Sequence, residues 1–291
     1  MLPNFIGLGA QKAGTTSLFE YLRVHPQVFL PKVKETNFFF RDAEYEKGIS
    51  YYESKYFSGV RNEKAVGEIS PDYLYHQVCT DRIRSHFEKQ LFIIVLRNPV
   101  ERAFSNYLME VRRGNENLSF EAAIATEEER IQRGHKEKDL YSYVHRGFYF
   151  DQIKAYMDCF QNSQFLIFLT EDLKNRRLET MARVFQFLGV DDHVLSHKVL
   201  DKEFHQASKM RYKWLHSYLM SPHWSRKILK LIIPNEKARY QIKTLIHQHN
   251  VKQIEQPKMK EDTRRKLVLR FKTANQQLHM LLGRDLSHWN E

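Results

Sequence analysis

Cysteine is scarce in this sequence, with only Cys79 and Cys159 among 291 residues. The two lie far apart and lack the spacing of metal ligands, so they read most simply as thiols in a reducing compartment. Glycine and proline are also few, at 11 and 8, and no Gly/Ser/Pro-rich linker, internal repeat or low-complexity segment divides the chain. We therefore expect a single domain over residues 1–291 rather than two smaller ones.

Acidic residues are outnumbered: the sequence has 35 Asp and Glu and 46 Lys and Arg, which gives a formal net charge of +11. Such an excess fits three kinds of partner: nucleic acid, an anionic membrane surface, or an anionic cofactor and acceptor. No helix-turn-helix, zinc-finger or RNA-binding signature is present, so we expect no nucleic-acid partner. No signal peptide or membrane anchor precedes the first strand-like run, which predicts a cytoplasmic protein.

Hydrophobic patterning alternates between strand-like and helical segments. Strand-like apolar runs occur at 4–9, 64–68, 91–96 and 164–169. Helical periodicity occurs at 16–24, 99–113, 119–134, 148–160, 171–188 and 263–282. This alternation predicts an α/β fold, in which helices flank a parallel sheet. Thr170 is a candidate N-cap of the 171–188 helix, with Gly189 after its end.

The segment FIGLGAQKAGTTSL, near the amino terminus, joins a short apolar run to a helix through a glycine-bounded loop. Such a unit aims backbone N–H groups and a helix N-terminus at one spot, where a phosphate binds. Gly9, Gly14 and Thr16 match the G-x-x-x-x-G-K-[ST] phosphate loop, but Thr15 stands in place of its lysine. Lys12, inside the loop, suits a different leaving group from that of an ATPase or kinase.

A second motif follows the apolar run at 91–96, where the sequence reads RNPVERAFSNY. Pro99 suits the first position of a helix, and Asn98 is available as its cap. Arg97 would then lie at the carboxyl end of a central strand. If that strand neighbours the first one, Arg97 lies beside the Lys12 loop.

Together the two motifs resemble those of sulfotransferases that use 3′-phosphoadenosine 5′-phosphosulfate (PAPS), which have a P-loop-like α/β fold, and release 3′-phosphoadenosine 5′-phosphate (PAP). GxQKAGTTSL is similar to the 5′-phosphosulfate loop of that family. LRNPVERAFSNY is similar to its 3′-phosphate motif, in which an arginine and a serine eight residues later bind the phosphate; here these are Arg97 and Ser105. The ending LLGRDLSHW is similar to the tail of bacterial and glycan-directed members, and the resemblance is poor only around 212–250.

The resemblance implies in-line transfer of a sulfuryl group, in which the protein mainly positions the reactants and stabilises charge. Lys12 is the candidate for stabilising the leaving oxygen. The residues implied to bind the 5′-phosphosulfate are Lys12, Ala13, Gly14, Thr15, Thr16 and Ser17. Ser17 would also hold Lys12 back until donor and acceptor are both bound. This scheme requires no metal.

A hydroxyl acceptor benefits from a general base within hydrogen-bond reach. Glu35, in KETNFFF, resembles the glutamate that acts as the base before an aromatic run in glycan sulfotransferases; the competing interpretation is a solvated acid among basic neighbours. Glu68, at the end of the second strand-like run, is another candidate. His76 or His145 is the fallback, because cytosolic members use a histidine.

Around the acceptor the sequence departs from the family pattern. Asn37 stands where many glycan-directed members have a histidine, and Ile69 where several have a lysine, so acceptor chemistry does not transfer. RGFY at 146–149 looks like the family segment near the acceptor cleft. Lys209 and Arg211 fall where relatives have a basic loop over the cofactor phosphates, and would either close on the 3′-phosphate or form a solvated charge pair.

Residues 212–250 turn basic, aromatic and apolar. We expect helices that form a lid or acceptor gate over the cofactor cleft, because apolar residues at helical spacing usually pack into a core. The weaker alternative is an amphipathic pair of helices lying on an anionic membrane surface.

These observations predict a sulfotransferase acting on a hydroxyl, or less favoured an amine, of a carbohydrate or other small metabolite. One rival is a P-loop kinase of small molecules, which would need a metal-binding acid and a lysine before Thr16. Another is a non-catalytic nucleotide-binding protein, favoured if Lys12 were dispensable. The acceptor, the regiochemistry and the oligomeric state are left open, since acceptor loops vary without disturbing the phosphate sites.

Overall fold

The computed structural model describes residues 1–192, 209–210, 251–252 and 258–291. The chain divides into two compact units, Met1–Phe204 with Met259–Glu291, and His205–Lys258. In the second unit, β6 (Lys209–Met210) pairs antiparallel with β7 (Val251–Lys252). The segment 212–250 lies outside the described residues, so the lid and the single domain both stay predictions.

The first unit is built on a five-stranded parallel sheet, which confirms the predicted α/β fold. The strand order is β2-β3-β1-β4-β5. The strands are β1 Phe5–Gly9, β2 Val28–Phe29, β3 Ala65–Ile69, β4 Leu91–Leu96 and β5 Phe165–Leu169. Because β1 and β4 are parallel neighbours, the Lys12 loop and Arg97 emerge at the same edge of the sheet.

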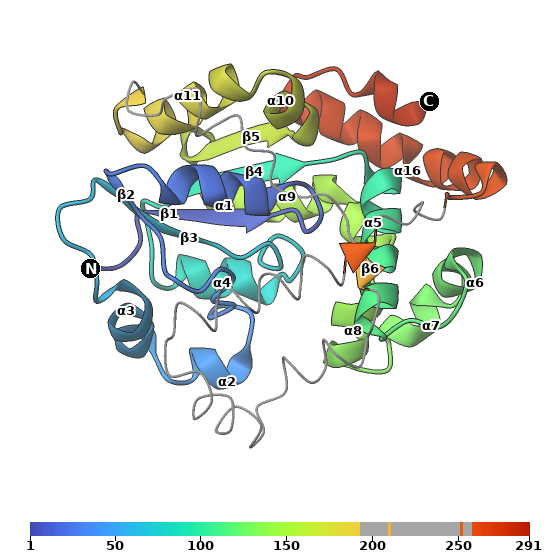
Figure 1. The fold of residues 1–291 in the computed structure, drawn as a ribbon, viewed down its shortest axis with the longest axis horizontal. Helices are drawn as coiled ribbons and strands as arrows, with labels where there is room; N and C mark the ends of the chain where they lie inside the picture. Colours follow the sequence, from blue (N-terminus) through green and yellow to red (C-terminus); the bar gives the residue numbers. More distant parts are fainter. Residues whose placement is uncertain (193–208, 211–250, 253–257) are drawn as a thin grey trace. The chain divides into compact units, whose positions relative to one another are not determined.

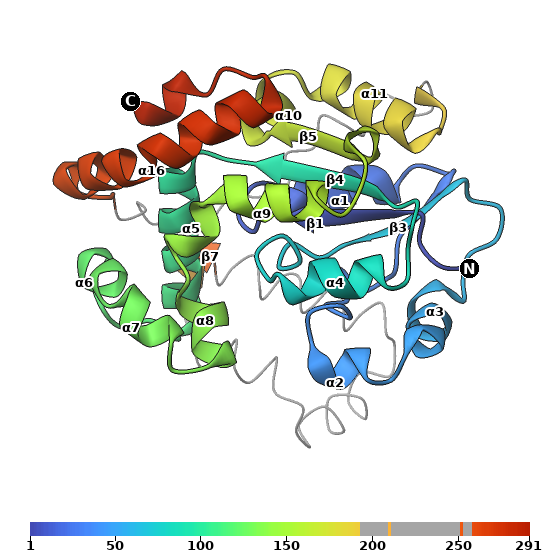
Figure 2. The ribbon, with the colours of Figure 1, turned by 180° about the vertical axis from the view of Figure 1, so that it is seen from behind.

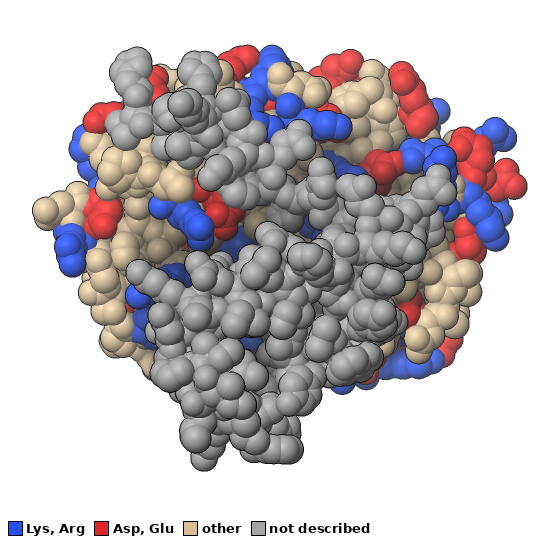
Figure 3. All heavy atoms as spheres, viewed as in Figure 1, with Lys and Arg blue, Asp and Glu red and all other residues tan. Residues whose placement is uncertain are grey.

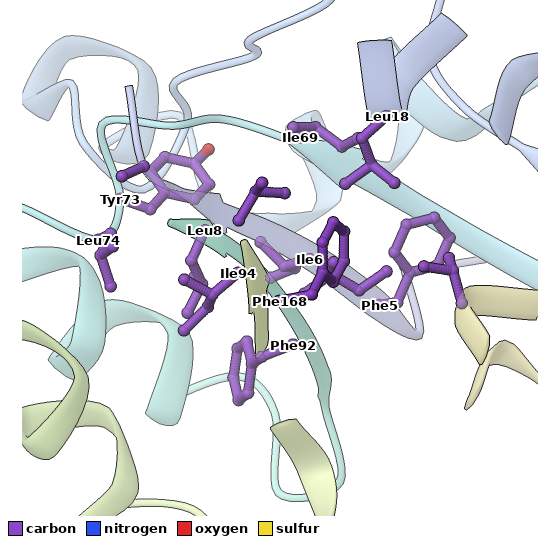
Figure 4. Packing of buried hydrophobic residues seen from close by; sticks show 14 of the residues in the cluster. Phe5, Ile6, Leu8, Leu18, Ile69, Tyr73, Leu74, Phe92, Ile94 and Phe168 are labelled. Atoms are coloured by element: carbon purple, nitrogen blue, oxygen red, sulfur yellow. The ribbon is translucent and has the colours of Figure 1, made fainter. Parts of the chain in front are cut away.

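Apolar side chains on both faces of this sheet form the main core. β1 and β3 are buried at every position, and β4 at all but its first, as expected for strands covered on both faces. Burial of one such side chain contributes roughly 1.5–3 kcal/mol relative to its exposure to water. Figure 4 shows how residues from four strands and α1 meet there: Phe5, Ile6, Leu8, Leu18, Ile69, Phe92, Ile94 and Phe168.

Helices cover both faces of the sheet. α1 (Thr15–Arg23) lies over the face seen in Figure 1, and α4 (Val78–Arg84) and α9 (Tyr149–Met157) lie over the face seen in Figure 2. Other α-helices of the first unit are α2 Asp42–Tyr45, α3 Ile49–Phe57, α5 Pro99–Arg113, α6 Phe120–Ala125, α7 Glu127–Ile131, α8 His135–Tyr141, α10 Thr170–Asn175, α11 Arg177–Leu188 and α16 Glu261–Leu282.

Two predicted helices are each divided into two shorter ones. The 119–134 pattern breaks at Thr126, whose hydroxyl donates to the carbonyl oxygen of Ala122 at 3.0 Å. The 171–188 pattern breaks at Arg176, whose backbone leaves the helical region at φ −134° and ψ 48°. Hydrophobic periodicity continues through both breaks and so does not reveal them. The short elements β2, α2, α3, α4 and α8 have no counterpart among the predicted elements.

Two predicted helix ends are confirmed. α5 begins at Pro99, and the Asn98 side chain accepts hydrogen bonds from two N–H groups of its first turn, at 2.9 and 3.3 Å. α16 ends at Gly283, whose φ of 59° is the left-handed conformation typical of a C-terminal cap. Its buried apolar stripe contains Leu267, Phe271 and Leu278. The closing helix is therefore part of the core of the first unit.

The described surface carries charges of both signs. Figure 3 shows Lys and Arg interspersed with Asp and Glu over the described part of one face. In the part of the chain that the structure describes, no helix has the length and apolar content to cross a membrane.

The strands β1 and β3 approach too closely at Gly67 for a side chain to fit. A Cβ at this position would lie 2.5 Å from three ring atoms of Phe5, which is fully buried. We expect Gly67→Ala to lower the free energy of unfolding by about 1–3 kcal/mol, because the ring cannot move without disturbing the core. Chemical denaturation measures this, with Lys89→Ala, at an exposed position, as the control. Equal stability of the two variants would contradict the packing described.

Candidate active site

The loop between β1 and α1 presents a helix N-terminus without a cap. Gly14, just before α1, has φ 102°, a conformation that costs glycine little because it has no Cβ. Among the described residues, no side chain caps α1, and an uncapped helix N-terminus is a common binding site for an anion. The predicted ligands in this loop and turn are Lys12, Ala13, Gly14, Thr15, Thr16 and Ser17.

Side-chain hydrogen bonds tie this loop to the ends of β4 and β5. Arg97 Nη1 donates to the carbonyl oxygen of Lys12 at 3.3 Å. The Thr170 hydroxyl donates to the carbonyl oxygens of Ala13 at 2.6 Å and Leu96 at 3.0 Å. Thr170 is the first residue of α10 rather than its cap, so that prediction is wrong: the hydroxyl points back to the loop instead.

Lys12 lies in strongly positive surroundings. Burial lowers its pKa, and the charges of Arg112, Arg113 and Arg97 lower it further, to about 8, while the Glu35 carboxylate acts in the opposite direction. In the described part of the chain, neither Lys12 nor Arg112 forms an ion pair with a carboxylate. Excess positive charge held partly out of water is typical of a site that binds an anion.

Glu101, in the first turn of α5, relates the positions of Arg97 and Ser105. Arg97 pairs with Glu101, with Nη2 3.7 Å from Oε2. Ser105 follows Glu101 by four residues in the helix, so the two share one face. Glu101 also pairs with Arg264 of α16. Arg97, which also contacts the Lys12 loop, and Ser105 therefore both lie near Glu101, and their role at the 3′-phosphate stays a prediction.

Glu35 belongs to a turn that follows β2. Its side chain is 40% exposed and forms an ion pair with Lys34. Because its charge raises the pKa of Lys12, the carboxylate lies within electrostatic reach of the loop. The carboxylate of the predicted base is open to solvent, and its role at the Lys12 loop stays a prediction.

The three alternative bases lie in other environments. Glu68 is 1% exposed, and hydroxyl groups donate to both of its oxygens. His76 stacks on Phe40 with ring centroids 4.1 Å apart, and burial lowers its pKa. His145 pairs with Glu128, with Nε2 2.6 Å from Oε1. Of the four candidates, Glu35 is the one with an exposed carboxylate.

The segment 146–149 contacts the second motif through a hydrogen bond from Tyr149 to Arg97. Arg146 is buried and donates to Oδ1 of Asp72 at 2.7 Å. The Tyr149 hydroxyl donates to the carbonyl oxygen of Arg97 at 2.9 Å. A position near the acceptor, as the resemblance implies, stays a prediction for this segment.

Sequence reasoning missed three cations of this region. Arg112 and Arg113 end α5, where basic residues are common because they complement the helix dipole, and only the fold brings them to Lys12. Arg264 comes from α16, far along the chain. Lys209 lies on β6 of the second unit and Arg211 outside the described residues, so their role at the 3′-phosphate stays a prediction.

Comparison with known proteins places this site in a family. The sequence matches the model of the sulfotransferase domain over residues 2–267. The membrane-associated sulfotransferase kil1 of Dictyostelium discoideum is 34% identical over 146 residues, or 46% of this chain. The bifunctional heparan sulfate N-deacetylase/N-sulfotransferase 4 of Mus musculus is 32% identical over 203 residues, or 66% of this chain. The chain spans 31% and 23% of these two relatives, less than a third of either.

A solved sulfotransferase structure resembles this chain over its whole length. The sulfotransferase from Alicyclobacillus acidocaldarius is 28% identical, with a TM-score of 0.74 and coverage of 100% of both chains. Both phosphate-loop motifs lie inside the residues that the family model matches. This chain therefore belongs to the family of PAPS-dependent sulfotransferases.

Proposed function

We propose that this chain transfers a sulfuryl group from PAPS to a hydroxyl, or less favoured an amine, of a carbohydrate or other small-molecule acceptor. The observation that carries the proposal is the excess of positive charge at the amino end of α1, where the pKa of Lys12 is lowered to about 8. Ammonium, guanidinium and backbone N–H groups are the donors that phosphate and sulfate prefer. The residues present therefore fit a nucleotide with several anionic groups.

Each residue then has a distinct role. PAPS, when bound, supplies a sulfuryl group whose S–O bond to phosphate breaks as a new bond forms from sulfur to the acceptor oxygen or nitrogen. Lys12, as an ammonium, would donate to the phosphate oxygen that gains charge. The first turn of α1 would hold the 5′-phosphate, and Arg97 with Ser105 the 3′-phosphate. Glu35 would take the proton that the acceptor loses.

The acceptor is proposed at the level of its chemical class. Relatives of this chain are named for heparan sulfate, which favours a carbohydrate. Asn37 and Ile69 depart from the glycan-directed pattern, so the proposal does not extend to one sugar or one position. Lys209 and Arg211 are proposed as further 3′-phosphate ligands, and 212–250 as the acceptor gate.

Binding of PAP tests the cofactor directly. We expect PAP to bind without added magnesium and more tightly than magnesium-ATP. Arg97→Ala should weaken PAP binding by about 10- to 150-fold, because a hydrogen bond to a charged group contributes roughly 1.5–3 kcal/mol. Isothermal titration calorimetry measures both quantities. Arg84→Ala, an exposed arginine at the end of α4, is the control and should bind PAP as the wild type does.

Other outcomes would favour the rival functions. Tighter binding of magnesium-ATP, or PAP binding that is indifferent to Arg97→Ala, would refute the proposal in favour of a small-molecule kinase. Tight PAP binding combined with full tolerance of Lys12→Ala, and no acceptor, would favour a non-catalytic nucleotide-binding protein.

A further inference from the structure

Glu68 is a buried carboxylate surrounded by hydroxyl donors. Its Oε1 accepts hydrogen bonds from Tyr52 and from Tyr73, the latter at 3.0 Å. Its Oε2 accepts from Thr36 and from Ser70, the latter at 2.7 Å. Burial raises the pKa of Glu68, and these four hydrogen bonds act in the opposite direction. We call these five residues the Glu68 cluster.

The cluster also holds the backbone that follows Glu35. Three successive N–H groups, those of residues 37–39, donate to the hydroxyl oxygens of Ser70, Thr36 and Tyr73, at 3.3, 3.4 and 3.3 Å in that order. An ionised carboxylate only accepts hydrogen bonds, so it draws the protons of the surrounding hydroxyls toward itself, and the Thr36 and Tyr73 hydroxyls also lie 3.1 Å from each other. The lone pairs of the hydroxyl oxygens therefore remain to accept hydrogen bonds from the backbone N–H groups.

The backbone held in this way is in an unfavourable conformation. Glu35 has φ 64° and Asn37 has φ 53°, in the left-handed region that residues with a Cβ enter only where their surroundings impose it. On the other side, Phe38 is fully buried and stacks on Tyr52, with ring centroids 4.4 Å apart. The turn is therefore anchored in the core, while the Glu35 carboxylate remains exposed.

We propose that Glu68 is a positioning residue, whose carboxylate orients the hydroxyls that hold residues 35–39 and thereby aims Glu35 at the Lys12 site. Glu68 itself is too deeply buried to touch donor or acceptor. The catalytic part of this inference rests on the proposed function, because it takes Glu35 as the base. The holding of the turn does not.

Hydrogen exchange followed by mass spectrometry tests the holding of the turn on the full, ligand-free chain. In Glu68→Gln the amide cannot accept all four hydroxyl protons, so the amides of residues 37–39 should exchange at least about tenfold faster. The peptide that contains the Lys12 loop should exchange at the wild-type rate. A general loosening of the fold would accelerate both peptides and would count against a specific role.

Variants of Thr36 keep the test decisive if Glu68→Gln folds poorly. Thr36→Val removes one hydroxyl at nearly constant shape and should also accelerate exchange of residues 37–39. Thr36→Ser keeps the hydroxyl and should retain the wild-type protection. Tyr51→Phe is the control, because it removes a hydroxyl hydrogen bond to Glu44 outside the cluster.

Turnover separates positioning from a merely structural role. With PAPS and a partly desulfated heparan sulfate fragment as the probe, Glu68→Gln should lower kcat by about 10- to 100-fold, as loss of an orienting partner typically does. PAP affinity should be unchanged. When Glu68→Gln is added to Glu35→Gln, kcat should fall little further. The reason is that Glu68 is proposed to act through Glu35, and the base is already absent from that variant.

Two results would overturn the proposal. One is wild-type exchange of residues 37–39 in both Glu68→Gln and Thr36→Val. The other is a loss of kcat in Glu68→Gln that adds in full to that of Glu35→Gln. A wild-type chain that fails to bind PAP would instead refute the proposed function, and the exchange rates would still decide whether Glu68 holds the turn.

Discussion

Glu35→Gln should lower kcat by about 10²- to 10⁴-fold, the usual contribution of a general base, while PAP binds as tightly as to the wild type. The amide keeps the size and shape of the side chain but cannot accept a proton from the acceptor hydroxyl. The Glu35 carboxylate is 40% exposed, so it is accessible to an acceptor, and its charge acts on the pKa of Lys12. Steady-state kinetics with PAPS and the heparan sulfate fragment measure the loss.

The same substitution has a second, independent signature. Glu35 raises the pKa of Lys12, so removing its charge should lower the pKa of Lys12 below about 8. The control is Glu46→Gln, which changes an exposed glutamate further along the chain. It should change neither kcat nor the pKa of Lys12. A Glu35→Gln variant with wild-type kcat would transfer the role of base to another residue, with His76 and His145 as the next to be substituted.

Lys12→Ala should lower kcat by about 10²- to 10³-fold, the effect of removing one donor from the oxygen on which charge develops. PAP affinity should fall much less than kcat, because the N–H groups of α1 and the arginines remain. Pre-steady-state and steady-state rates of PAP release measure the loss. Lys89→Ala, an exposed lysine outside the site, is the control.

The pH dependence gives the sign of the Lys12 contribution. The pKa of Lys12 is lowered from 10.5 to about 8, so the ammonium predominates below pH 8 and the neutral amine above it. Since kcat/KM reports the free enzyme, it should decline above about pH 8, by about tenfold per pH unit. Lys12→Arg keeps its positive charge to higher pH and should remove this decline. An identical alkaline decline in Lys12→Arg would assign it to another group.

Much of the site was predictable because its two phosphate-binding segments are local structures. The Lys12 loop is a strand, a glycine-bounded turn and a helix start, and its conformation depends on residues that are neighbours in sequence. The Asn98 cap and Pro99 likewise mark the start of α5 without reference to the rest of the chain. Helix breaks at Thr126 and Arg176 escaped prediction because apolar periodicity runs through them.

The sequence by itself determined the two strand–loop–helix units and their candidate ligands Lys12, Arg97 and Ser105, since short-range interactions specify such units. Only the tertiary structure decided that the charges of Arg112 and Arg113 act on Lys12, and that Glu68 is buried beneath the Glu35 turn rather than exposed as a base. Those contacts depend on the parallel order β3-β1-β4 and on the side chains packed around it. No pattern among neighbouring residues encodes that order, because it is a property of the whole sheet.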